Sequence, residues 1–206
     1  ELIHGYMAAT SYMDAQVGLL LDKLEVLGIQ DNTVVILWGD HGFHLGDHGL
    51  WTKHTNFEQA VRSPMIISAP KGFTTNKNNS PTEFVDIFPT LCELTNLTIA
   101  KHLPGKSLVP LMKDPNTSLR FAALSQYPRG AKRMGYTLRS ERFRYVKWLQ
   151  MNYKTGERNG SLIATELYDY QNDPLETVNQ SDNPDYKQVV KAFENEFKRR
   201  NVAQLN

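Results

Sequence analysis

The sequence has a single cysteine, no long apolar run and no excess of positive charge. Cys92 cannot form a disulfide within the chain, and its neighbours supply neither a CxxC motif nor the Cys/His spacing of a zinc site. No stretch approaches the roughly 18 consecutive apolar residues that predict a membrane helix. With 23 basic and 22 acidic side chains the net charge is +1, which does not favour nucleic acid binding. We therefore expect neither a membrane span nor a nucleic acid partner.

The chain also lacks the features of a natural amino terminus. It begins with Glu1 rather than Met and has no basic segment followed by an apolar stretch, so we expect it to be an internal segment of a longer protein. Its 206 residues are enough for one large domain, or for a domain with a small appendage.

The first part of the chain has the pattern of an α/β domain. Apolar residues at three- and four-residue steps predict a helix from Leu2 to Leu27, which should end near Gly28. Residues 33–38 form an apolar, β-branched run typical of a central strand buried on both faces. A second buried strand is expected at residues 65–69 and a further helix from Phe84 to Leu94.

The last part of the chain has a different pattern. Four short strands are predicted in succession, with a hairpin between the middle two at Arg139–Arg142, and Pro184 is expected to open a final helix. We therefore predict two units: residues 1–118 in an α/β domain, and residues 119–206 in a small antiparallel sheet with one helix. The four strands are residues 121–127, 134–138, 143–149 and 166–170.

The residues with the clearest chemical meaning lie between Gly39 and His54. Asp40 and His41 directly follow the predicted buried strand, at the end where ligands bind in open α/β sheets. Flanking glycines allow the backbone to approach a ligand closely. We interpret Asp40 and His41 as metal ligands. Because Ca²⁺ takes six to eight oxygen ligands, most of the coordination must come from elsewhere.

Five other positions in or after this segment are relevant. The Asp-His pair recurs at Asp47 and His48, where short polar side chains often hold a turn instead. Lys53, twelve residues after His41, can fold back beside the cation and bind an anionic group as a point charge. Glu58 and Arg62 are expected to pair with each other or with solvent.

The run WGDHGFHLGDHGLWTKHTNFE, followed by RSPMIISAP, resembles the core domain of type I sulfatases of the alkaline phosphatase superfamily. The later strings LSQYPR, MGYTLRSERFRYVKW and ELYDYQNDPLETVN look most like iduronate-2-sulfatases. The resemblance implies an α/β, alkaline-phosphatase-like core fragment followed by a small α+β antiparallel subdomain. It also implies a sulfuric ester hydrolase acting on sulfated sugars or glycosaminoglycans, located in the periplasm, outside the cell or in lysosomes.

The same resemblance assigns roles to individual residues. Asp40 and His41 match two calcium ligands, and Lys53 matches the catalytic lysine that contacts the sulfate ester. His44 is interpreted as a residue that faces the sugar, and Arg129 as a guanidinium that pairs with a uronate carboxylate. In this family the nucleophile is a formylglycine made from a Cys or Ser in a CxPxR-type motif.

This chain departs from the family pattern in several respects, because the N-terminal pair of Asp ligands, the nucleophile segment and the upstream Lys and His partners of the family are absent from it. Cys92 lies in Thr-Leu-Cys-Glu-Leu, without the Pro and Arg of that motif, so the formylglycine is expected upstream, outside the chain. We therefore expect the chain alone to be inactive and to need the missing N-terminal part of a sulfatase, or a companion chain or another copy. Two alternatives remain open: a phosphodiesterase or phosphonate hydrolase of the same superfamily, and a non-catalytic sulfatase-like module.

Overall fold

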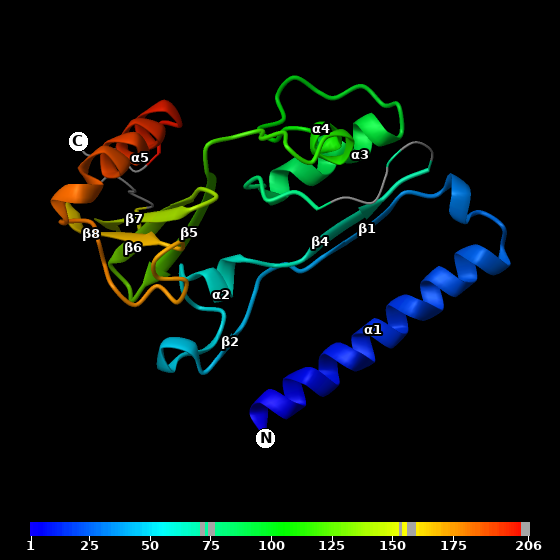
Figure 1. Cartoon of the computed structure of the whole chain (residues 1–206), viewed down its shortest axis with the longest axis horizontal. Helices are drawn as coiled ribbons and strands as arrows, with labels where there is room; N and C mark the ends of the chain where they lie inside the picture. The colour runs from blue at the N-terminus through cyan, green and yellow to red at the C-terminus, as the bar shows by residue number, and fades with distance from the viewer. Residues whose placement is uncertain (71–72, 74–76, 153, 156–159, 203–206) are drawn as a thin grey trace.

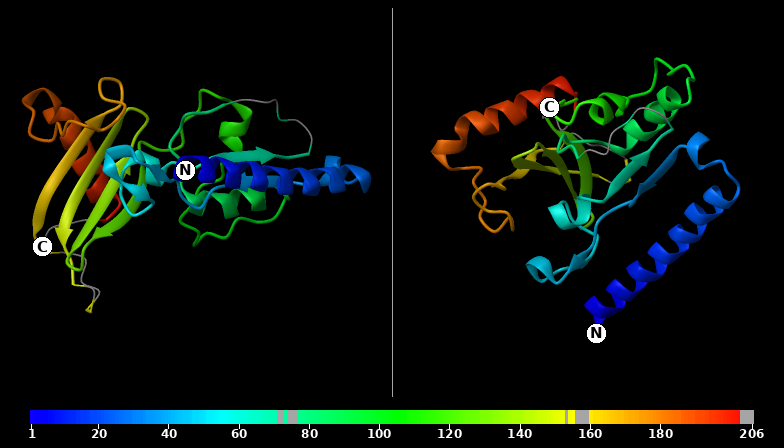
Figure 2. Two further views of the ribbon diagram at one scale, coloured as in Figure 1. Left: turned by 90° about the horizontal axis from the view of Figure 1, so that it is seen from below. Right: turned by 45° about the vertical axis from the view of Figure 1, so that its right-hand side comes forward.

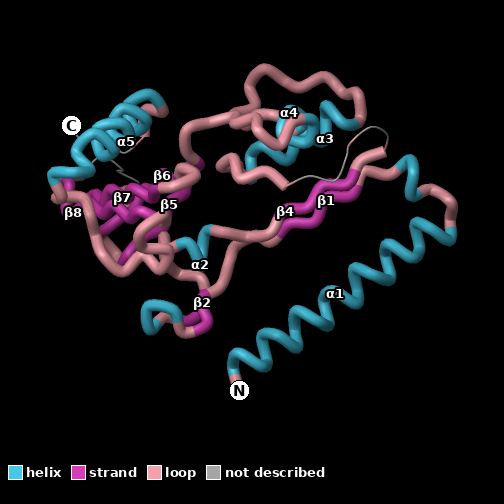
Figure 3. The backbone as a smooth tube through the Cα atoms, in the orientation of Figure 1, coloured by secondary structure: helices cyan, strands magenta, loops and turns pink. Residues whose placement is uncertain are grey.

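The computed structural model of the chain describes residues 1–70, 73, 77–152, 154–155 and 160–202. A long helix, a pair of strands and two short helices form one half, and a four-stranded sheet with a last helix forms the other (Figure 1). The tube in Figure 3 shows how helix and strand alternate in the first half before the strands follow one another directly. Within the described residues, no helix has both the length and the apolar character needed to cross a membrane.

The N-terminal helix α1 (Leu2–Val26) ends where the sequence predicts, with Gly28 in the left-handed region at φ 66°. No residue of α1 is buried. Leu19 and Leu20 are 63% and 69% exposed, and one ring contact, Tyr6 to Phe43 with centroids 5.0 Å apart, joins the helix to the rest of the chain. The apolar side chains of α1 are therefore largely uncovered.

Strands β1 (Val35–Trp38) and β4 (Met65–Ser68) pair antiparallel. Helix α1 lies on one side of them, and helices α3 (Ile87–Leu94) and α4 (Val109–Lys113) lie on the other (Figure 1). The two strands were predicted, but the prediction that β1 is buried on both faces is wrong. Trp38 is 46% exposed and Ile66 on β4 is 60% exposed. Among the described residues β4 is the one strand that pairs with β1, so the other edge of β1 is unpaired in this part of the chain.

Short helices, strands and 3₁₀ turns connect the longer elements of the first half. These elements are the 3₁₀ turns Gln30–Asn32, Asp47–Gly49 and Phe84–Asp86, strands β2 (His44–Leu45) and β3 (Trp51–Thr52), and helices α2 (Glu58–Val61), α3 (Ile87–Leu94) and α4 (Val109–Lys113). The single cysteine, Cys92, lies on α3, and its thiol is free and buried.

The four remaining strands form the predicted antiparallel sheet, in the order β5-β6-β7-β8. Helix α5 (Lys187–Arg199), preceded by a 3₁₀ turn at Pro184–Tyr186, packs on one face with Phe193 and Phe197 fully buried. The strands are β5 (Ala123–Arg129), β6 (Arg133–Arg139), β7 (Phe143–Gln150) and β8 (Leu162–Asp169), and the core under α5 consists of Ala122, Met134, Tyr136, Leu138, Tyr145, Leu149, Leu167, Phe193 and Phe197.

The opposite face of this sheet meets the segment that joins β3 to α2. Because successive side chains of a strand point to opposite faces, Gly135 lies on the face away from α5. A side chain at Gly135 would collide with the Asn56 amide at 2.3 Å and with the Trp148 ring at 2.8 Å. The two views in Figure 2 show α5 and α2 on opposite sides of the sheet. The sheet therefore has a helix on one face and the residue 54–58 segment on the other.

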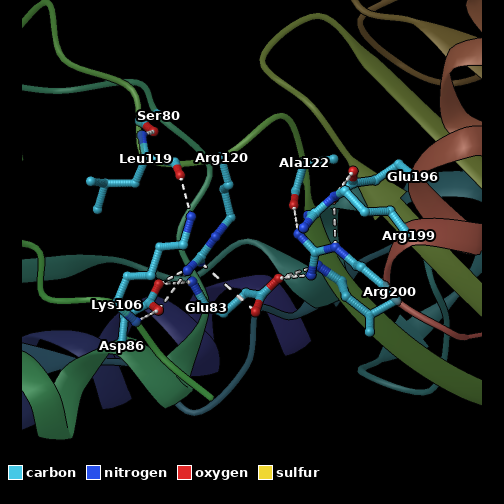
Figure 4. A network of polar contacts seen from close by, with 11 residues as sticks. Ser80, Glu83, Asp86, Lys106, Leu119, Arg120, Ala122, Glu196, Arg199 and Arg200 are labelled. Atoms are coloured by element: carbon cyan, nitrogen blue, oxygen red, sulfur yellow. Dashed lines mark hydrogen bonds and ion pairs between the residues drawn. The ribbon is translucent and has the colours of Figure 1, made fainter. Parts of the chain in front are cut away.

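A polar network joins the two halves of the molecule (Figure 4). Asp86, fully buried, accepts two hydrogen bonds from the Arg120 guanidinium, one of them at 2.6 Å. Arg200 pairs with Glu83 at 2.7 Å and with Glu196 at 2.7 Å. The proposed division into units at residues 118 and 119 stays a prediction, and this network spans it.

Candidate functional site

Asp40 and His41 lie in the turn that directly follows β1. The turn is fixed by backbone hydrogen bonds from Gly39 to Pro64 (3.1 Å) and from Gly42 to Ala60 (2.8 Å). A Cβ at position 42 would lie 2.0 Å from the carbonyl oxygen of Gln59, so only glycine fits there. The close approach of the two segments is thus built into the sequence at Gly42.

The His41 ring is oriented by its neighbours. Its Nδ1 lies 2.7 Å from the carbonyl oxygen of Gly42, and because a carbonyl oxygen only accepts, Nδ1 carries the proton. The lone pair is then on Nε2, which accepts from the Lys53 ammonium at 2.7 Å and lies 3.5 Å from Asp40 Oδ1. A backbone bond that sets the tautomer in this way is typical of histidines that bind metals.

The structure therefore brings together three of the predicted site residues: Asp40, His41 and Lys53. The Asp40 side chain is 84% exposed and that of His41 is 30% exposed, so both can be reached by an ion from solvent. Among the described residues no group of three or more His, Cys, Asp or Glu side chains could hold a metal. The pair suits a divalent cation chemically, with one carboxylate oxygen and one imidazole lone pair, but supplies only two of its ligands.

The second Asp-His pair belongs to the fold of the loop itself. Asp47 accepts from the backbone amide of Leu45 at 3.2 Å, and His48, with φ 56°, stacks on Phe57 with ring centroids 4.1 Å apart. These contacts hold the turn between β2 and β3. They leave Asp40 and His41 as the pair available for a ligand.

His44 is fully buried, with its Nε2 2.7 Å from the Thr55 hydroxyl. Burial and the nearby His48 lower its pKa, which keeps the ring neutral. A side chain with no exposed surface has nothing with which to touch a sugar, so this position does not favour the predicted contact with substrate.

Arg129 is exposed at the end of β5. Two residues earlier, the Tyr127 hydroxyl is 2.5 Å from Nδ1 of His54, and the Tyr127 carbonyl accepts from Asn56 at 3.3 Å. His54 adjoins Lys53 in the sequence, so these bonds connect β5 to the Lys53 loop. His54 is not among the site residues predicted from the sequence, although it is one of four histidines within the motif.

The Lys53 loop is further held by a buried ion pair that was not predicted from the sequence. Arg144 and Glu176 are 1% and 2% exposed and lie 2.7 Å apart. Arg144 donates to the Asn56 carbonyl and lies over the Phe57 ring at 4.8 Å, while Glu176 accepts from the Glu58 amide at 3.0 Å. Arg144 and Asn56 are 88 positions apart in the chain, and Glu176 and Glu58 are 118 apart. No local pattern in the sequence predicts contacts over such separations.

The prediction that Glu58 pairs with Arg62 or with solvent is wrong. The partner of Glu58 is Arg139, with contacts of 2.8 and 3.0 Å, and not Arg62. Burial would raise the pKa of Glu58, but hydrogen bonds from Arg139 outweigh it and the net shift is downward. Glu58 therefore remains ionised, and the segment after the Lys53 loop is tied to β6 by charge.

Comparison with known proteins places the chain. The family model for sulfatases matches residues 1–97. The chain is 30% identical to human iduronate 2-sulfatase, over 87% of the chain and 44% of that protein. It is 32% identical to the choline-sulfatase of Rhizobium meliloti, over 87% of the chain and 33% of that protein. The chain thus spans less than half the length of these curated relatives.

Solved structures agree. A protein determined in complex with its substrate D-glucosamine-2-N,6-O-disulfate is 25% identical, with a TM-score of 0.72 over 94% of this chain and 40% of that one. The phosphonate monoester hydrolase of Agrobacterium radiobacter is 26% identical, with a TM-score of 0.68 over 90% and 38%. The chain belongs to the sulfatase family, and its fold is part of the alkaline-phosphatase-like α/β fold followed by the antiparallel sheet.

Proposed function

We propose that this chain contributes part of the active site of a sulfuric ester hydrolase that acts on sulfated sugars. One observation carries the proposal: Lys53 lies 2.7 Å from Nε2 of His41, beside Asp40. A carboxylate, an imidazole lone pair and an ammonium at one strand end suit a cation together with the sulfate oxygens that it would hold. The similarity to iduronate 2-sulfatase over 87% of the chain supports sulfated uronic acids as substrates.

Each of the three residues would have a distinct part in the reaction. Asp40 and His41 would hold a calcium ion, which supplies positive charge against the oxygens of the transferring sulfuryl group. Lys53 would bind one of those oxygens as a point charge and stabilise the charge that develops there. Without an ion, the one free lone pair of His41, on Nε2, accepts from the Lys53 ammonium. If His41 holds the ion, this hydrogen bond would be given up and the ammonium would turn to a sulfuryl oxygen. Arg129 would pair with a uronate carboxylate.

The nucleophile of this reaction would be a formylglycine on a segment outside this chain. The uncovered surfaces of α1 and β1 support such a segment, because Leu20 is 69% and Trp38 46% exposed. This chain covers 44% of human iduronate 2-sulfatase and 33% of the choline-sulfatase, which supports a further segment as well. The partner would be the N-terminal part of a sulfatase, in the same polypeptide, in a companion chain or in another copy, and this chain alone would not turn over a sulfate ester.

A protein that carries this chain together with such a segment provides the test. Replacing Lys53 by Met should lower kcat/KM for a sulfated uronate by about 10²- to 10³-fold, whereas Lys101→Met, an exposed lysine outside the site, should leave it unchanged. Asp40→Asn should raise the calcium concentration needed for activity. Full activity of the Lys53→Met protein would contradict the proposal.

A second candidate is a phosphonate monoester hydrolase, favoured by the structural similarity to the Agrobacterium radiobacter protein. Parallel assays with a sulfate monoester and a phosphonate monoester separate the two. A kcat/KM at least about tenfold higher for the sulfate ester supports the sulfatase, and the reverse ratio supports the alternative. We call the protein that carries this chain together with the N-terminal segment the complemented protein. If it has neither activity, the chain is better explained as part of a non-catalytic module.

A further inference from the structure

Two arginines face each other at the end of the β5–β6 hairpin. Arg129 and Arg133 are paired in the strand register, so their Cα atoms are about 4.5–5.5 Å apart and their side chains share one face of the sheet. Both are exposed, and Lys132 in the turn adds a third cation. Like charges directly opposite each other destabilise a sheet. The pair therefore needs an explanation.

The other end of the same sheet face shows how this protein balances such a pair. Arg139 and Arg144 are also directly opposite each other, on β6 and β7. Glu58 neutralises Arg139 at 2.8 Å and Glu176 neutralises Arg144 at 2.7 Å. In the part of the chain that the structure describes, no ion pair with a carboxylate is formed by Arg129 or Arg133, although the face is the same.

The Arg129–Arg133 pair lies beside the candidate active site. Tyr127, two residues or roughly 7 Å along β5 from Arg129, bonds His54 at 2.5 Å, and Lys53 is the preceding residue. Burial is the main cause that lowers the pKa of His44, followed by His48, and Arg129 contributes to the same shift. Arg129 is thus within electrostatic range of the loop that carries Lys53.

We propose that Arg129 and Arg133 together form a subsite for a second anionic group of the substrate, separate from the sulfate ester held near Lys53. The group is a carboxylate or a further sulfate on the same oligosaccharide. Two guanidinium forks on one sheet face can each donate a pair of hydrogen bonds to such an oxyanion. The inference rests on the proposed function for its substrate class, and it adds Arg133 as a residue that selects substrates with more than one negative charge.

A binding experiment tests the subsite without any turnover. The probe is a disaccharide of a 2-O-sulfated uronic acid and an N,6-O-disulfated glucosamine, titrated into this chain by calorimetry. The double variant R129Q/R133Q should raise Kd at least about tenfold, since it removes charge-assisted hydrogen bonds. The control K187Q/K191Q removes the same charge from exposed positions on α5 and should change Kd less than about twofold.

Two further measurements make the result decisive. R129Q/R133Q should keep the thermal midpoint or raise it slightly, because it removes a like-charge pair, which excludes loss of fold as the cause of weaker binding. Carboxyl-reduced and desulfated forms of the probe identify the group that the arginines bind, since the effect of the variant should disappear with one of them. An unchanged Kd for R129Q/R133Q, an equal loss in K187Q/K191Q, or an effect that survives both modified probes would overturn the subsite.

Hydrolysis distinguishes failure of the subsite from failure of the proposed function. If the complemented protein cleaves sulfate esters while R129Q/R133Q binds the probe as tightly as the unchanged chain, only the subsite is overturned. If R129Q/R133Q weakens binding but no sulfate ester is cleaved, the subsite stands and the sulfatase proposal fails.

Discussion

Arg200 and Glu83 form an ion pair at 2.7 Å although they lie 117 residues apart. Glu83 precedes the 3₁₀ turn that leads into α3, and Arg200 directly follows α5. The same Glu83 accepts from the Leu124 amide at 2.8 Å, at the start of β5. One carboxylate thus joins the α3 region, the first strand of the sheet and the end of the last helix (Figure 4).

Loss of this connection should reduce stability. Arg200→Met removes hydrogen bonds to Glu83 and Glu196 and to the Ala122 carbonyl, and we expect the free energy of unfolding to fall by about 1.5–3 kcal/mol. Arg199→Met is the matched control, since Arg199 is 66% exposed and, among the residues that the structure describes, pairs with Glu196 alone. It should cost less than about 1 kcal/mol. Urea unfolding measures both, and equal losses would show that Glu83 is not the important partner.

The buried pair Arg144 and Glu176 should be needed for order in the Lys53 loop. Glu176→Gln leaves the Arg144 charge buried without its counter-charge, and we expect a loss of about 3–5 kcal/mol. Hydrogen exchange at the Glu58 amide, which donates to Glu176, should become faster. Glu141→Gln, at an exposed position, should change stability by no more than about 0.5 kcal/mol. Unchanged exchange at Glu58 would refute the role of this pair.

Acid stability should depend on Asp169. A hydrogen bond from Arg142 lowers the pKa of Asp169 to about 2 from 3.8, despite burial. Because the folded-state pKa is lowered, the carboxylate stabilises the fold fully above about pH 4, and this contribution of about 2 kcal/mol is lost as the pH falls toward 2. Asp169→Asn should make the unfolding free energy less dependent on pH in this window. An identical pH profile for both proteins would contradict the assignment.

Two glycines should respond oppositely to alanine. Gly42→Ala brings Cβ to 2.0 Å from a backbone carbonyl, so we expect a loss of about 2–3 kcal/mol together with a shift of the His41 ring signals. Gly5→Ala meets nothing within 4 Å in α1 and should stabilise the helix by about 0.5–1 kcal/mol. Thermal unfolding and the NMR signals of His41 test the pair, and a neutral Gly42→Ala would show that the turn can widen.

Local patterns in the sequence predicted most elements of the fold. The three- and four-residue spacing in α1 and the short strand-like runs of β5–β8 depend on neighbours in the sequence. The burial of β1 was predicted wrongly. Its apolar run is typical of a central strand in a larger sheet, whereas among the described residues β1 pairs with β4 alone.

The candidate site could be predicted only where its residues share one short segment. Asp40, His41 and Lys53 lie within fourteen residues, and the structure brings them within hydrogen-bonding or ion-pair distance. The supporting contacts of Arg139, Arg144 and Glu176 arise from strand pairing and packing across long sequence separations, for which a single sequence holds no signal. The predicted pairing of Glu58 with Arg62 failed for the same reason.

The antiparallel register of β5 and β6 has an all-or-none consequence. Since the length of the turn fixes the register of a hairpin, a single residue inserted or deleted between Arg129 and Arg133 would shift the pairing and separate the two arginines. Side-chain substitution could adjust the strength of the proposed anion binding by degrees, but a change in turn length would abolish it. A family that diversifies its substrates on this scaffold should therefore vary the residues at the hairpin end while conserving the number of residues between positions 129 and 133.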